Sequence, residues 1–236
     1  MSDQQSITSQ LRQAAPEALK AALAVMAGYV VIGIPAGILE SRIGVGAVTA
    51  FFISITFYTG AGQFMIPNMW LAGLPAATIM ASTSLVGSRQ MLYAASFSPY
   101  FARTSKALST LFALTVTDES YGVNYDRFTQ SDSWDALRAT LVNIFCMLSW
   151  ASANALGCIV GDILGLPLAI ASFAMTSIFI CLLVTQPASD IKLHVIIASA
   201  AAVFVCKLIG LGGLAVFLGS IVGVVVGMFW RMRGEA

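Results

Sequence analysis

Apolar runs of membrane-spanning length cover most of this chain, and three ionisable side chains fall inside them. Arg89 lies in the segment GSRQ, and Asp118 and Glu119 lie in TVTDES. Of the 236 residues, 58% are hydrophobic and 10% are charged, and the mean hydropathy is +0.86. A chain this apolar is predicted to fold in a lipid bilayer. Because a charged side chain is costly there, each of the three residues marks a candidate functional site.

The predicted fold class is an all-α polytopic membrane protein of about seven to eight membrane segments, including broken or re-entrant half-helices. The apolar runs are continuous, whereas the strands of a membrane barrel alternate apolar and polar residues. About eighteen polar residues precede the first run and no cleavage pattern follows it, so a cytoplasmic segment is expected there and not a signal peptide. The expected organisation is this segment at 1–18, a single transmembrane transport domain at 19–230 and a short polar C-terminus at 231–236.

Two apolar stretches, 44–71 and 74–101, have a length that one simple span does not explain. Each holds about 28 residues, or about 42 Å of helix at about 1.5 Å per residue. That length exceeds a hydrocarbon core of about 30 Å but is too short for two full spans. The sequence therefore predicts helix breaks at Gly60–Gly62, within TGAGQF, and at Gly87–Arg89, within GSRQ.

The other apolar runs are predicted as membrane segments at 19–39, 107–123, 137–160, 166–185, 193–209 and 214–230. In the first run, the segment GIPAG contains Pro35, which predicts a helix kink, between two glycines that permit close approach of a neighbouring helix. In the second, Asp118 is predicted near the membrane midplane. The last run carries three glycines at four-residue spacing, which predict a flat face for packing another helix: Gly219, Gly223 and Gly227.

Several functional classes lack the motifs they would need. The chain contains no phosphate-binding GxxxxGK[ST] loop, and its one histidine, His194, is not part of an HExxH motif. The four cysteines show no CxxC spacing, so neither a metal nor a cofactor is expected. The net charge of +1 provides no basic surface for nucleic acid. Enzymatic chemistry is therefore not expected. A small-solute channel is the alternative function, although TGAGQF resembles a selectivity filter only weakly.

Broken helices and polar groups at mid-depth together favour a secondary transporter. A half-helix that begins inside the membrane directs unpaired N–H groups and the positive end of its dipole at an anion. The candidate groups for a substrate carboxylate are Gly60, Gly62, Gln63, Ser88 and Arg89. Asp118 and Glu119 are candidates for binding an ammonium group or a coupling ion. Two alternatives stay open: Arg89 pairs with one of these acids as a structural bridge, or the glycines serve packing only.

Four motifs occur in the order in which one known family has them: GIPAG, TGAGQF, GSRQMLYAASFSP and TDES. Over residues of about 15 to 230 the chain resembles the AzlC family, the large membrane subunit of bacterial branched-chain amino-acid exporters. The third motif departs from the family pattern Asn-x-Arg-His, because Ser88 and Gln90 flank Arg89. A role that depends on that Asn or His is therefore not carried over.

The resemblance implies a multi-pass protein of the bacterial inner membrane that exports valine and also leucine, isoleucine or methionine. An ion gradient, expected to be protons, would drive the export. The resemblance also implies a small AzlD-type membrane subunit as partner, and the glycine face of Gly219, Gly223 and Gly227 would suit its packing. A third possibility is that the chain mainly supports this partner and that transport resides elsewhere.

Overall fold

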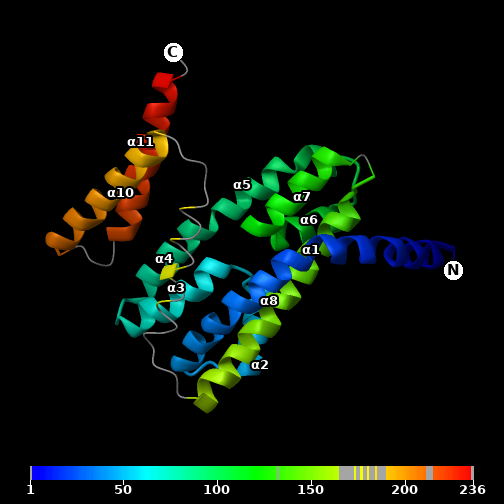
Figure 1. The fold of residues 1–236 in the computed structure, drawn as a ribbon, viewed down its shortest axis with the longest axis horizontal. Helices are drawn as coiled ribbons and strands as arrows, with labels where there is room; N and C mark the ends of the chain where they lie inside the picture. Colours follow the sequence, from blue (N-terminus) through cyan, green and yellow to red (C-terminus); the bar gives the residue numbers. More distant parts are fainter. Residues whose placement is uncertain are drawn as a thin grey trace.

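The computed structural model describes residues 2–131, 133–164, 190–210 and 215–234, together with residues 173, 176, 177, 180 and 184. Every regular element within these residues is helical, which confirms the predicted all-α fold class (Figure 1). The elements are α1 Ser2–Arg42, α2 Ala47–Thr56, α3 Gly60–Leu71, α4 Ala76–Gly87, α5 Arg89–Ser96, the short 3-10 helix η1 Ser98–Phe101, α6 Lys106–Thr115, α7 Asp118–Gln130, α8 Ala136–Leu164, α10 Asp190–Leu208 and α11 Ala215–Gly234.

Three of the described helices are long and apolar enough to cross a bilayer. They cover Gln10–Arg42 in α1, Ala136–Ile163 in α8 and Ile191–Leu208 in α10. Ala47–Thr56 and Leu218–Met232 are shorter apolar helices. The total of seven to eight membrane segments stays a prediction, and the predicted run 166–185 lies almost wholly outside the described residues.

The two long helices α1 and α8 run side by side and form the centre of the molecule (Figure 1). Glycines let their backbones touch, as the GIPAG segment predicted. A Cβ atom on Gly37 would lie 2.0 Å from the carbonyl oxygen of Asn154, and one on Gly157 would lie 2.2 Å from that of Ile34. The Cys158 thiol donates across the contact to the Gly37 carbonyl at 3.2 Å. The helix α1 is continuous through Pro35, so the kink at this residue stays a prediction.

A helix break lies at 57–59, directly before the position Gly60–Gly62 at which it was predicted in TGAGQF. The helix α2 ends at Thr56 and α3 begins at Gly60, with the Thr59 side chain accepting a hydrogen bond from the Gly62 N–H. At Ser88 the interruption is smaller. This residue has a helical conformation, and no side chain caps the start of α5.

A further break, at 116–117, was not predicted and corrects the reading of 107–123 as one continuous segment. The helix α6 ends at Thr115, and α7 begins at Asp118. Thr117 and Ser120 form a capping box, in which each side chain bonds to the backbone N–H of the other residue. Asp118 therefore begins a helix, where an acidic side chain is stabilised by the helix dipole.

The glycine face of α11 packs against another helix of the same chain. The expectation that this face packs a partner subunit is therefore corrected. A Cβ atom on Gly219 would lie 2.4 Å from a methyl group of Val203, and one on Gly223 would lie 2.3 Å from the Ser199 hydroxyl. A Cβ atom on Gly227 would lie 3.2 Å from a methyl group of Val195. All three neighbours belong to α10, which forms a second helix pair with α11 (Figure 1). The sequence predicted the flat face, but it could not predict which helix covers that face.

Replacing Gly37 with alanine should destabilise the protein, because the added methyl group would overlap a backbone oxygen of α8. Overpacking of this kind costs about 1–3 kcal/mol. Gly28 is the matched control, since it lies in the same helix with open space around it. Thermal unfolding of the purified variants in detergent should show a lower midpoint for Gly37→Ala and an unchanged or slightly higher one for Gly28→Ala. Equal midpoints would contradict the close packing of the two helices.

Candidate functional site

A small cavity with both polar and apolar lining residues lies where the three helix breaks meet. Its wall comes from α1, from the α2–α3 connection, and from the first turns of α3, α5 and α7, with one residue of α8. Its volume of about 40 Å³ is enough for about three water molecules. The lining residues are Tyr29, Ile32, Tyr58, Thr59, Gly60, Ala61, Phe64, Arg89, Gln90, Thr117, Asp118, Glu119 and Trp150.

One side of the cavity is suited to an anion. Gly60 and Ala61 form the first turn of α3 and line the cavity. The N–H groups of a first turn have no acceptor within their own helix, and they lie at the positive end of its dipole. The Arg89 guanidinium reaches the same cavity from α5. Backbone amides and a guanidinium therefore converge on the space where a carboxylate could bind.

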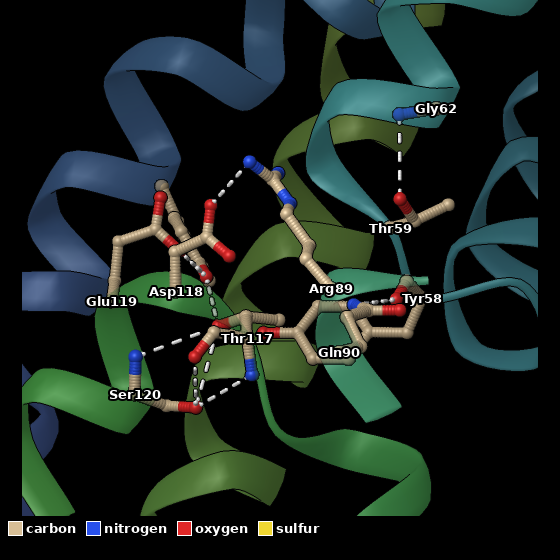
Figure 2. A network of polar contacts seen from close by, with 10 residues as sticks. Tyr58, Thr59, Gly62, Arg89, Gln90, Thr117, Asp118, Glu119 and Ser120 are labelled. Atoms are coloured by element: carbon tan, nitrogen blue, oxygen red, sulfur yellow. Dashed lines mark hydrogen bonds and ion pairs between the residues drawn. The ribbon is translucent and has the colours of Figure 1, made fainter. Parts of the chain in front are cut away.

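The same cavity carries two carboxylates, Asp118 and Glu119, each with its own partner (Figure 2). Asp118 forms an ion pair with Arg89 at 2.9 Å, and their side chains are 24% and 38% exposed. The structure therefore contains the Arg89–Asp118 bridge that the sequence left open as an alternative. The bridge lies on the cavity wall and is half-open to its surroundings, so a charged solute could exchange with either partner.

Glu119 is held by a buried tyrosine of α1. The Tyr29 hydroxyl donates to Glu119 Oε2 at 2.7 Å and lies 2.7 Å from the Thr117 hydroxyl. Because the single Tyr29 proton is directed at Glu119, the Thr117 hydroxyl donates to Tyr29. Tyr29 is only 4% exposed, and its ring packs edge-on against Trp150. This chain of hydrogen bonds fixes the start of α7 to α1.

The predicted site residues divide into two groups. Gly60, Arg89, Asp118 and Glu119 line the cavity, whereas Gly62, Gln63 and Ser88 do not. The Ser88 hydroxyl donates to the Leu85 carbonyl of its own chain segment, and the Gly62 N–H donates to the Thr59 cap.

Gln63 lies behind the cavity wall and connects three helices. Its amide nitrogen donates to Glu40 Oε1 of α1 at 2.9 Å and to the Ser54 hydroxyl of α2 at 2.7 Å. Its amide oxygen accepts from the indole N–H of Trp150 at 2.5 Å. Since an indole N–H can only donate, the orientation of the amide group is determined.

Three residues that sequence reasoning missed contribute to this region: Tyr29, Glu40 and Trp150. Tyr29 and Trp150 lie inside apolar runs, where aromatic residues are common and mark no position. Glu40 directly follows an apolar run, and an acid there is usually read as a solvated helix end. A second feature near Arg89 is an open apolar groove between α4 and α11, which Arg89 borders together with Leu85 and Val224.

These features define a polytopic α-helical membrane protein with a cavity between broken helices that is lined by charged and apolar residues. The chain belongs to the AzlC family, whose model, described as AzlC protein, matches residues 24–164. It is 26% identical over 209 residues to the branched-chain amino acid transport protein AzlC of Bacillus subtilis (strain 168), which covers 87% of this chain and 80% of that protein. No solved structure matches the chain.

Two further relatives are membrane proteins by name. The inner membrane protein YgaZ of Escherichia coli (strain K12) is 26% identical over 152 residues, covering 62% of this chain and 60% of that protein. An uncharacterized membrane protein of Haemophilus influenzae is 21% identical over 180 residues, covering 76% and 74%. The matched residues 24–164 include every residue that lines the cavity.

Replacing Tyr29 with phenylalanine should destabilise the protein, because it keeps the ring but removes the hydroxyl that joins Thr117 to Glu119. Loss of a buried hydrogen bond to a charged group costs about 1.5–3 kcal/mol. The control is Tyr125→Phe on α7, since Tyr125 is 50% exposed. Thermal unfolding in detergent should show a clearly lower midpoint for the first variant only. Equal midpoints would mean that the bond does not hold α7 to α1.

Proposed function

We propose that this chain is the large subunit of an exporter for neutral branched-chain amino acids in the bacterial inner membrane. Valine is the expected substrate, with leucine, isoleucine and methionine as further ones. Support comes from family membership and from the name of the Bacillus subtilis relative. Residues 19–230 would form the transport domain. We further propose that export occurs by proton antiport and needs no cofactor.

The observation that carries the proposal is that one cavity holds both groups suited to an anion and two carboxylates. The amides of Gly60 and Ala61 and the guanidinium of Arg89 would receive the substrate carboxylate, and Asp118 or Glu119 would receive its ammonium group. A neutral amino acid is a zwitterion and carries both groups on one carbon atom. Partners for both charges within one cavity therefore match this class of solute better than an anion or a cation alone.

The side chain of the substrate would meet apolar walls. Ile32, Phe64 and Trp150 line the cavity beside the polar groups. An apolar pocket separates substrates by only about 1–3 kcal/mol for each methylene group. Overlapping transport of valine, leucine, isoleucine and methionine is therefore expected.

Binding would require the cavity to widen and the Arg89–Asp118 pair to open. A volume of about 40 Å³ holds a few waters and no amino acid. A substrate carboxylate that reached Arg89 would replace the Asp118 carboxylate as its partner and leave Asp118 for the ammonium group. Such an exchange keeps every charge paired, which a low-dielectric site requires.

We also propose a small AzlD-type membrane subunit as partner, and this part of the proposal is supported only by the family resemblance. The glycines of α11 pack against α10, so a partner would use another face.

Replacing Arg89 with alanine should slow valine efflux, because the substrate carboxylate loses its charged partner. A hydrogen bond to a charged group contributes about 1.5–3 kcal/mol, which corresponds to about a ten- to hundredfold lower rate at limiting substrate. Arg103→Ala is the control, since Arg103 is exposed and lies outside the cavity. Efflux of labelled valine from preloaded cells would measure both variants at matched protein levels. An unchanged rate for Arg89→Ala would remove Arg89 from the mechanism.

Reconstitution in proteoliposomes separates this proposal from its alternatives. A carrier should exchange labelled valine with saturable kinetics, whereas a channel shows neither saturation nor counterflow. An imposed pH gradient should accelerate net valine movement, and indifference to that gradient would rule out proton antiport. Vesicles that contain each subunit alone would show whether transport resides in this chain or in its partner.

A further inference from the structure

A buried carboxyl group outside the cavity has the environment of a proton-binding site. Glu40 lies near the end of α1 and is 4% exposed. Its Oε1 atom accepts from Gln63, and its Oε2 atom is buried with no hydrogen-bond partner among the described residues. Such orphaned polar atoms are rare in folded proteins and call for an explanation.

Within the described part of the chain, no positive charge compensates Glu40 from the helices packed around it. The helices α2 and α3, which contribute Ser54 and Gln63, contain no titratable residue at all. The helix α8 presents Cys158, whose thiol donates to a backbone carbonyl, and the exposed Asp162. On α1 itself, Arg42 is exposed, and none of the described ion pairs includes Glu40.

An unpaired carboxylate in such a setting is very costly, and binding a proton removes the charge. A metal cation fits less well. The Gln63 amide group directs its N–H atoms at Glu40 Oε1 and at the Ser54 hydroxyl, so two of the oxygens that a cation would need already accept hydrogen bonds. The indole of Trp150 prevents the amide group from turning over.

Glu40 is connected to the cavity by two hydrogen bonds in series. Gln63 bonds to Glu40 at one end and to Trp150 at the other, and Trp150 lines the cavity beside Gly60. A carboxylate attracts an amide N–H more strongly than a neutral carboxyl group does. Loss of the Glu40 proton would therefore pull on Gln63 and so on the side chain that shapes the cavity.

The acids on the cavity wall are less suited to carrying a proton. Asp118 is paired with Arg89, and Glu119 accepts from Tyr29 and lies in the first turn of α7. Both settings stabilise the charged carboxylate. These two acids are thus suited to an ammonium group, whereas Glu40 lacks any such support.

We propose that Glu40 is the proton-binding site of this transporter and that Gln63 and Trp150 link its protonation to the substrate cavity. The proposal rests on the proposed function, and it assigns the coupling ion to a residue that does not touch the substrate.

Glu40→Gln in proteoliposomes tests the link, because the amide keeps the size of the side chain but cannot exchange a proton. Valine uptake driven by a pH gradient should fall about tenfold or more, within the usual range of coupling free energies. Exchange of labelled valine at equal concentrations should persist, since it needs no net proton movement. Glu17→Gln is the control: Glu17 lies on the same helix, its side chain is 58% exposed, and it pairs with Arg138. Gradient-driven uptake that stays at the wild-type level and keeps its pH dependence would overturn the proposal.

A second measurement separates failure of this proposal from failure of the proposed function. Infrared spectra of the purified wild-type protein should contain the band of a protonated carboxyl group, which Glu17→Gln keeps and Glu40→Gln lacks. If wild-type vesicles show no saturable valine exchange, the proposed function fails while this band still decides whether Glu40 holds a proton. Absence of the band would overturn the proton site itself, as would wild-type flux that follows a sodium gradient alone.

Should Glu40→Gln fail to accumulate in the membrane, Glu40→Asp takes its place. The shorter acid retains a carboxyl group but moves it away from Gln63, so the pH at half-maximal driven uptake should shift. An unshifted midpoint would contradict the proposal.

Discussion

The whole cavity depends on one constraint, that backbone groups exposed by a helix break inside an apolar protein must find partners. Water is scarce there, and an unpaired N–H or C=O group is costly. Two of the three breaks meet this demand with a threonine. Thr59 caps α3, and Thr117 caps α7 through its box with Ser120. Residues of the first turns of α3, α5 and α7 line the cavity, so the same breaks that interrupt the helices also bring polar groups to its wall.

Sequence reasoning could find the features that depend on local chemistry. The mismatch between an apolar stretch and the bilayer thickness predicted a break at Gly60–Gly62, and the structure has it directly before Gly60. The GIPAG glycines predicted a close helix contact. The break before Asp118 also had a local signal, because a threonine followed by two acids and a serine is typical of a helix start. That signal was read as part of a continuous run, since the flanking residues are apolar.

Features that depend on tertiary contacts could not be predicted. The sequence shows that the glycines of α11 form a flat face but not that α10 covers it. Gln63 was expected at the cavity, yet the indole of Trp150 and the carboxyl of Glu40 hold it behind the wall. Burial of Glu40 depends on tertiary packing, including its bond to Gln63 of α3, so no pattern around residue 40 could indicate it.

The glycine contact between α1 and α8 has a mechanical consequence. At Gly37 and Gly157 the two main chains touch with no side chains between them, so neither helix can slide past the other by one residue without collision. The pair would then behave as a stationary frame during a transport cycle. Displacement falls to the short helices α2 to α7, whose interruptions supply the pivots, and the substrate would be released by their rearrangement against a fixed backbone.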